Sequence, residues 1–138
     1  MKAVGYYSPL PITSDESLVD LELSVPVPGR HDLLVRVEAI SVNPVDVKVR
    51  AGVKPPEGDA KVLGWDVAGV VEDIGSEVAL FKPGDKVFYA GALDRPGANS
   101  ELHVVDERIV GCKPTFRATS SSNIFLTPGV TSLVVECS

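Results

Sequence analysis

The chain alternates short apolar runs with turns rich in glycine and proline over most of its length. Residues 32–42 read DLLVRVEAISV, and alternate positions there separate onto two faces, which predicts the clearest strand. Pro83 and Gly84 fit the centre of a type II turn, because proline presets φ and glycine accepts a positive φ. Similar apolar runs predict further strands over residues 1–7, 18–25, 62–74, 87–90, 100–105 and 108–110.

Residues 43–52, NPVDVKVRAG, predict one short helix. Asn43 suits the N-cap, and Pro44 suits the first helical position, where no amide hydrogen is needed. Asp46 in the first turn and two basic residues in the last turn match the helix dipole, and Gly52 ends the helix. The valines of this segment alternate as they would in a strand, so a strand remains an alternative.

Together these elements predict a mainly β domain over residues 1–114, a closed or partly open barrel with one or two short helices. Residues 115–138 differ, because serine and threonine dominate their first half and acidic residues almost disappear. We therefore expect this segment to be a separate tail after the barrel.

Composition narrows the class of partner. The 138 residues are 44% hydrophobic, which is enough for a real core. Their net charge of −6 argues against a nucleic-acid partner. No apolar run approaches the roughly 18 residues of a membrane span, and the N-terminus turns acidic too early for a signal peptide. Cys112 and Cys137 form no disulfide framework, so we expect a cytoplasmic protein with Cys112 as a small apolar filler.

The motifs of common cofactor sites are missing from the sequence. No two glycines are separated by a single residue and no GxxxxGK[ST] occurs, so we expect no Rossmann domain in this chain. The metal-binding residue types are His31, His103, Cys112 and Cys137, without a CxxC or HExxH pattern. We expect a structural role for His103, a solvated His31 and no metal site.

Four residues remain as catalytic candidates: Asn43 and Asp46 in the helix segment, and Trp65 and Asp66 in GWDVAG. Each has an alternative role, since Asn43 can be only a helix cap and Asp46 can merely favour the helix dipole. Trp65 is the single tryptophan and suits a core. Asp66 is less ordinary, because a carboxylate inside an apolar strand needs a partner when it is buried.

Several segments carry a resemblance to a known family. They are MKAV at the start, DLLVRVEAISVNPVDVKVRAG (32–52), LGWDVAGVVEDIGSEVALFKPGDKVF (63–88) and GANSELHVVDERIV (97–110). In order and spacing the chain resembles the N-terminal domain of the medium-chain dehydrogenase/reductase superfamily, within it the zinc-independent quinone oxidoreductases, also labelled zinc-type alcohol dehydrogenase-like. The resemblance implies a GroES-like barrel, NADPH as hydride donor, and a quinone, activated alkene or carbonyl compound as the small-molecule acceptor.

Departures from the zinc-dependent relatives concern the ligands. The resemblance places Asn43 where those relatives have a cysteine and Trp65 where they have a histidine, while Asp66 replaces a glutamate. It therefore implies no zinc in this site. The Asn43-Pro44 pair matches the quinone reductase pattern near the nicotinamide, so Asn43 could hydrogen-bond either the cofactor amide or the substrate oxygen.

The end of the chain also departs from the family. Residues 125–133, FLTPGVTSL, are similar to a linker in which a threonine approaches the cofactor, which makes Thr127 and Thr131 cofactor-binding candidates. The family continues into a Rossmann domain, so we expect the isolated chain to be inactive. A non-enzymatic GroES-like binding module and a truncated product without activity remain alternatives, and uncovered sheet edges favour a homodimer.

Overall fold

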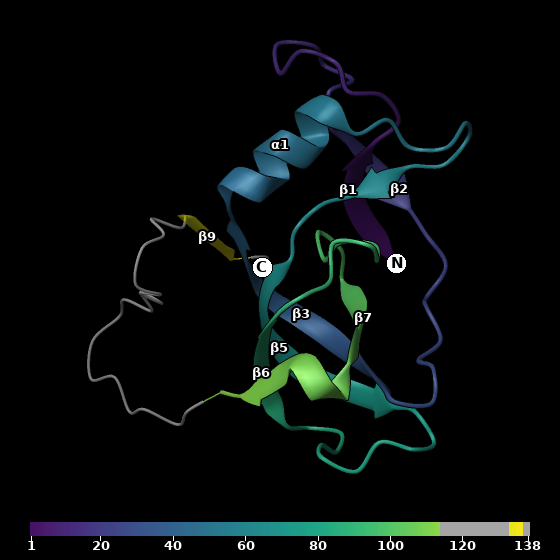
Figure 1. The fold of residues 1–138 in the computed structure, drawn as a ribbon, viewed down its shortest axis with the longest axis vertical. Coiled ribbons are helices and arrows are strands. Elements are labelled where there is room, and N and C mark those ends of the chain that lie inside the picture. The colour runs from purple at the N-terminus through teal and green to yellow at the C-terminus, as the bar shows by residue number, and fades with distance from the viewer. Residues whose placement is uncertain (114–132, 137–138) are drawn as a thin grey trace.

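A computed structural model describes residues 1–113 and 133–136 of the chain. Within these residues the fold is mainly β, with two antiparallel sheets that do not close into a full barrel and one α-helix, α1 (Pro44–Gly52). The large sheet lies at one end of the molecule, and α1 lies with the small sheet at the other (Figure 1). The predicted mainly β class, partly open and with few helices, is confirmed.

The large sheet is built around its longest strand, β3 (Asp32–Val42), which has the bounds that alternation predicts. The strand order is β7-β3-β5-β6-β8, and β9 pairs with the second half of β3 beyond β7. Two register shifts against β5 mark bulges, which let β3 bend around the core. The other strands are β5 (Asp66–Ile74), β6 (Lys86–Ala90), β7 (Leu102–Asp106), β8 (Val110–Cys112) and β9 (Leu133–Glu136).

The small sheet has the order β2-β1-β4, with β1 (Lys2–Tyr6) between β2 (Val19–Glu22) and β4 (Lys61–Val62). A single β-bridge from Ala3 to Ser100 links β1 to the segment that leads into β7. The two sheets are thereby tied together close to the start of the chain.

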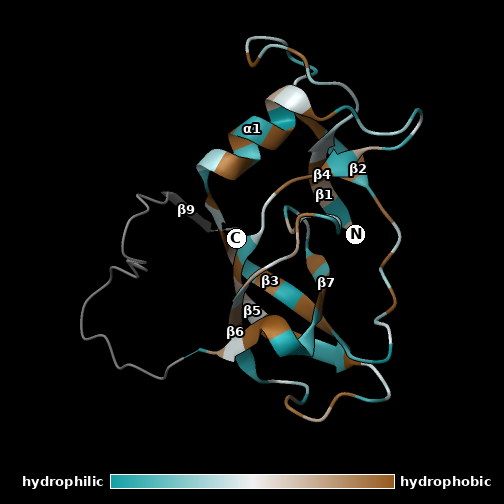
Figure 2. Ribbon diagram, viewed as in Figure 1, coloured by the Kyte–Doolittle hydropathy of each residue, from teal (hydrophilic) through white to brown (hydrophobic). Residues whose placement is uncertain are grey.

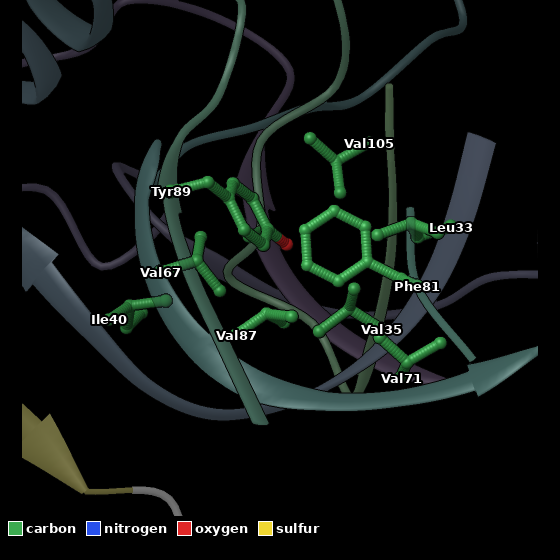
Figure 3. Packing of buried hydrophobic residues seen from close by; sticks show 10 residues of the cluster. Leu33, Val35, Ile40, Val67, Val71, Phe81, Val87, Tyr89 and Val105 are labelled. Atoms are coloured by element: carbon green, nitrogen blue, oxygen red, sulfur yellow. The ribbon is translucent and has the colours of Figure 1, made fainter. Parts of the chain in front are cut away.

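The main core lies in the hollow of the large sheet, where side chains from β3, β5, β6 and β7 meet (Figure 3). Burial alternates along β5, β6 and β7, so one face of each of these strands turns inward. Figure 2 shows apolar and polar residues mixed along β3. Truncating a large side chain in such a core costs about 2–5 kcal/mol. The buried members are Leu33, Val35, Ile40, Val67, Val71, Phe81, Val87, Tyr89, Ala98 and Val105.

The single strand predicted over residues 62–74 is wrong, because the structure has two strands there. β4 ends at Val62 and β5 begins at Asp66, and residues 63–65 form a link between them. Gly64 in this link has φ +91°, a left-handed conformation that interrupts a strand and that glycine adopts readily. The sequence shows the glycine but not the sign of its φ.

Other local predictions have mixed outcomes. The turn at Pro83-Gly84 is confirmed, since the Asp85 amide donates to the Lys82 carbonyl at 3.1 Å and Gly84 has φ +94°. The strand predicted over residues 108–110 is instead a 3₁₀ turn, η1 (Glu107–Ile109), followed by β8. Cys112 is exposed and is therefore not the apolar filler we expected.

Candidate functional site

Three segments converge where β3 ends. They are the N-cap of α1 at Asn43, the first turn of α1 at Asp46, and the 63–65 link that leads into β5 at Asp66. Asp46 accepts a hydrogen bond from the link, and Asn43 donates one to Asp66. Three of the four catalytic candidates thus lie in one hydrogen-bonded group.

Asp46 holds this group together through its backbone contacts. One carboxylate oxygen accepts from the Asn43 amide at 2.8 Å, and the other accepts from the Gly64 amide at 2.9 Å. The residue is only 5% exposed, so both bonds form away from water. The bond to Asn43 is one half of a capping box, and the bond to Gly64 fastens the helix to the link. The contacts of Asp46 are those of a positioning residue.

The link is fixed on its other side by residues 97–99. The Ala98 and Asn99 amides donate to the Gly64 and Leu63 carbonyls at 2.6 and 2.8 Å. A Cβ added to Gly64 would lie 2.3 Å from Asn99 Oδ1, so no larger residue fits without displacement. Sequence reasoning did not single out Gly64, although it precedes two candidates directly.

Asn43 occupies the N-cap and forms a capping box with Asp46, which turns its side chain toward the Asp46 backbone amide, but its side-chain oxygen makes no hydrogen bond there. Its Nδ2 donates to Asp66 Oδ2. Its Oδ1 is buried and has no hydrogen-bond partner within the described part of the chain. The amide that sequence reasoning considered as a possible helix cap is therefore available to something else.

Ser41 adds a second polar atom to the same face. Ile40 and Val67 are register partners that face the main core, so their neighbours Ser41 and Asp66, which also pair, face away from it. Ser41 Oγ is buried and, among residues 1–113 and 133–136, has no partner either. A buried polar atom without a partner is destabilising by about 1–3 kcal/mol, so such atoms point to a missing ligand or water. The position of Ser41 two residues before Asn43 on a strand was the signal that could have identified it.

Trp65 points into a small apolar cluster. It is 3% exposed and packs with Tyr6 and Leu63, while Val45 and Val49 of α1 cover the cluster. Its Nε1 is buried and unpartnered in the described residues. The Tyr6 hydroxyl lies 2.8 Å from the Val53 carbonyl, and burial raises the pKa of Tyr6. Trp65 thus packs against the face of α1 that carries Val45 and Val49.

The described residues offer no group of three or more histidines, cysteines or acids that could hold a metal ion. At the converging segments, both oxygens of Asp46 already bind backbone amides, and asparagine and tryptophan are not usual zinc ligands. His31 lies elsewhere and is half exposed, between Glu77 at 3.0 Å and Glu107 at 3.5 Å. The residues at this position therefore do not fit a zinc ion.

His103 forms a buried pair with Tyr89. The Tyr89 hydroxyl lies 2.8 Å from His103 Nδ1, and His103 Nε2 lies 3.0 Å from the Pro96 carbonyl. When Tyr89 donates to Nδ1 and Nε2–H donates to Pro96, a neutral imidazole is fully satisfied. Burial lowers the pKa of His103 and raises that of Tyr89. These contacts give His103 a structural role, as we expected, but its pairing with Tyr89 could not be predicted from the sequence.

Pro44 is the first residue of α1 and is exposed, directly beside Asn43. Thr127 and Thr131 lie outside the described residues, as does Cys137. In the part of the chain that the structure describes, no helix is long and apolar enough to cross a membrane.

Comparison with known sequences identifies related proteins. The family profile of the alcohol dehydrogenase GroES-like domain matches residues 29–122. A "Zinc-type alcohol dehydrogenase-like protein" from Staphylococcus epidermidis is 40% identical over 115 residues, which are 83% of this chain and 34% of that protein. A "Quinone oxidoreductase" from Pseudomonas aeruginosa is 48% identical over 81 residues, covering 58% of this chain and 24% of the relative.

Solved structures agree with these relatives. A Rhizobium etli protein, assigned provisionally to the zinc-dependent alcohol dehydrogenases, is 61% identical with a TM-score of 0.80, over 83% of this chain and 33% of that one. The Escherichia coli quinone oxidoreductase complexed with NADPH is 29% identical with a TM-score of 0.69, over the same shares.

The chain spans about a third of the length of the curated relatives that it matches over most of its own length. The family profile covers well over half of the chain, and the β architecture agrees with it. The chain therefore belongs to the alcohol dehydrogenase GroES-like domain family, within the medium-chain dehydrogenase/reductase superfamily.

Proposed function

We propose that this chain forms the part of an NADPH-dependent, zinc-independent oxidoreductase that receives the nicotinamide ring and a small acceptor. The acceptor class is a quinone or an activated alkene or carbonyl compound. One observation carries the proposal: the side-chain NH₂ of Asn43 donates to Asp66, and the buried side-chain oxygen of Asn43 has no partner among the described residues. A carboxamide N–H is a group of the right kind to complete this hydrogen bond.

Two relatives support the choice of reaction. The Pseudomonas aeruginosa relative is named a quinone oxidoreductase, and the Escherichia coli quinone oxidoreductase is a complex with NADPH. They match 58% and 83% of this chain, respectively.

The chain's own residues would bind and orient the reactants. Asn43 accepts from the carboxamide, Ser41 offers a hydroxyl on the same face, and Asp46 keeps the end of β3 fixed against the link. When bound, the dihydronicotinamide supplies a hydride, and a proton from water completes the two-electron reduction of the acceptor. The rate gain would come from holding nicotinamide and acceptor in one orientation.

Zinc has no place in this proposal, since the residues at the site do not fit it. Residues 1–114 would be the barrel and residues 115–138 a distinct tail, with Thr127 and Thr131 as further cofactor contacts. We also propose that the 138 residues alone do not reduce quinones, since their sequence contains no pyrophosphate-binding glycine motif. A homodimer remains a prediction.

A titration of the ¹⁵N-labelled chain with NADPH tests the proposal. We expect the backbone amide signals of Ser41, Asn43 and Asp66 to shift. The dissociation constant should be on the order of 1 mM, because the sequence has no pyrophosphate-binding glycine motif. Adenosine 2′,5′-bisphosphate, which lacks the nicotinamide, should leave these signals in place, and Asn43→Ala should abolish the NADPH shifts. Equal shifts with both ligands, or NADPH shifts only in other parts of the chain, would show that the site is not a nicotinamide site.

A further inference from the structure

The Asn43 side chain has a donor end and an acceptor end, and the structure separates them. The NH₂ group faces Asp66, while Oδ1 is buried without a partner in the described residues. An ionised carboxylate has no hydrogen to donate, so only the NH₂ end of the amide can satisfy it. Asp66 therefore determines that the oxygen of the Asn43 side chain, and not its NH₂ group, is available to a ligand.

We infer that Asp66 is a positioning residue that turns Asn43 into a hydrogen-bond acceptor toward the ligand, so that the site selects ligand groups carrying an N–H or O–H. The ligand part of this inference rests on the proposed function. The orientation of Asn43 follows from the contacts of the chain itself and can be tested without any ligand.

Both partners are held in place by their backbones. The Asn43 amide N–H is bound by Asp46, and the Ser41–Asp66 register is part of the β3–β5 ladder. Rotating the side-chain amide of Asn43 by half a turn would bring its oxygen against an Asp66 oxygen and lose a charge-assisted hydrogen bond. The surrounding structure thus keeps one orientation of the amide.

This orientation decides between two roles that the resemblance left open for Asn43. A nicotinamide carboxamide can donate its N–H to Oδ1, whereas the carbonyl oxygen of an acceptor has no hydrogen to offer. Asn43 therefore binds the cofactor amide and does not polarise the acceptor. The Ser41 hydroxyl, on the same face and also unpartnered in the described residues, is the group that can donate to an acceptor oxygen.

Two small probes test the selection. 1-Methylnicotinamide carries the carboxamide, and 1-methyl-3-acetylpyridinium has nearly the same shape and charge but lacks the N–H. We expect the full chain to bind the carboxamide probe about tenfold more tightly, as one hydrogen bond to a buried acceptor would give. Affinities come from ¹⁵N-detected shifts of the Asn43 amide signals.

Asp66→Asn removes the selection without changing the size of the side chain. An asparagine at position 66 can both donate and accept, so either orientation of Asn43 becomes available, and the preference should fall to within about twofold. The matched control is Asp73→Asn, which neutralises an exposed carboxylate on the same strand and should keep the preference. Both probes carry one positive charge, so losing an acid affects their affinities alike.

The outcomes are distinct. A collapse of the preference in Asp66→Asn but not in Asp73→Asn supports the inference, and a preference that survives Asp66→Asn overturns it. When neither probe shifts Asn43 in the unsubstituted chain, the proposed nicotinamide site is wrong. The orientation is then decided by the Asn43 side-chain NH₂ signals, because Asp66 positions the amide only if Asp66→Asn moves them and Asp73→Asn does not.

Discussion

Replacing Asp46 by alanine should destabilise the fold more than any other single change of an acidic residue at the site. The carboxylate binds the Asn43 and Gly64 amides at 2.8 and 2.9 Å and is only 5% exposed. A hydrogen bond to a charged group contributes about 1.5–3 kcal/mol, and a buried amide left alone is itself unfavourable. We expect Asp46→Ala to lower the free energy of unfolding by about 3–4 kcal/mol, a large part of the usual 5–15 kcal/mol.

Urea unfolding followed by tryptophan fluorescence measures this loss. Trp65 is the single tryptophan, is 3% exposed, and belongs to the link that Asp46 holds, directly after Gly64. Asp46→Asn keeps one acceptor oxygen but turns an NH₂ toward the second amide, so we expect roughly half of the alanine effect.

Asp73→Ala is the control, because this carboxylate is exposed and, within residues 1–113 and 133–136, accepts a hydrogen bond only from the adjacent Ile74 backbone amide. It should stay within about 0.5 kcal/mol of the unsubstituted chain. A loss below about 1 kcal/mol for Asp46→Ala, close to the control, would refute the view that Asp46 holds the helix and the link together.

Three further predictions follow from the same structure. Gly58 has φ +89° with open space around it, so Gly58→Ala introduces only backbone strain and should lower the free energy of unfolding by about 1 kcal/mol. At Gly64 the added Cβ also lies 2.3 Å from Asn99 Oδ1, so Gly64→Ala should lower it by about 1–3 kcal/mol more in urea unfolding. Equal losses for the two variants would contradict this. Burial lowers the pKa of His103, so the unfolded chain binds that proton more tightly, and the stability from neutral His103 is present above about pH 6.5 and lost as the pH falls below it. His103→Phe should therefore flatten the change in urea midpoint between about pH 7.5 and 5.5, and an unchanged slope would argue against it. Chain purified from zinc-supplemented medium should contain no stoichiometric zinc after dialysis, and metal analysis showing one tightly held ion per chain would overturn the zinc-independent proposal.

The strands were predictable where one face is buried and the chain is straight. β3 has the predicted bounds because its apolar run lies between a turn and the Asn43-Pro44 pair, at which α1 begins as predicted. The break before β5 was not predictable, because it depends on the φ of Gly64 and on amide contacts from residues 97–99. Such contacts join segments more than thirty residues apart in sequence, and an apolar pattern carries no information about them.

The candidate site shows the same division. Residue types and the family resemblance selected Asn43, Asp46, Trp65 and Asp66, and the structure joins all but Trp65 by hydrogen bonds. Their different contacts come from tertiary structure: Asp46 binds backbone amides, while Asp66 binds the Asn43 side chain 23 residues away. A carboxylate in a sequence looks the same in both roles, so only the contacts distinguish the residue that holds the scaffold from the one that sets the direction of the amide.

Asn43 and Trp65, the two positions where the resemblance expects zinc ligands in zinc-dependent relatives, have different contacts in this chain. Asn43 keeps a polar atom available for a ligand, whereas Trp65 is buried among Tyr6, Leu63 and the valines of α1. A histidine at position 65 would place a polar ring in this apolar cluster and leave part of the indole volume empty, which is destabilising by several kcal/mol. Introducing a histidine at position 65 would therefore weaken the packing that supports α1. Trp65 packs against α1, and Asp46 of α1 binds the Asn43 backbone amide. The position of the Asn43 side chain therefore depends on the packing of Trp65.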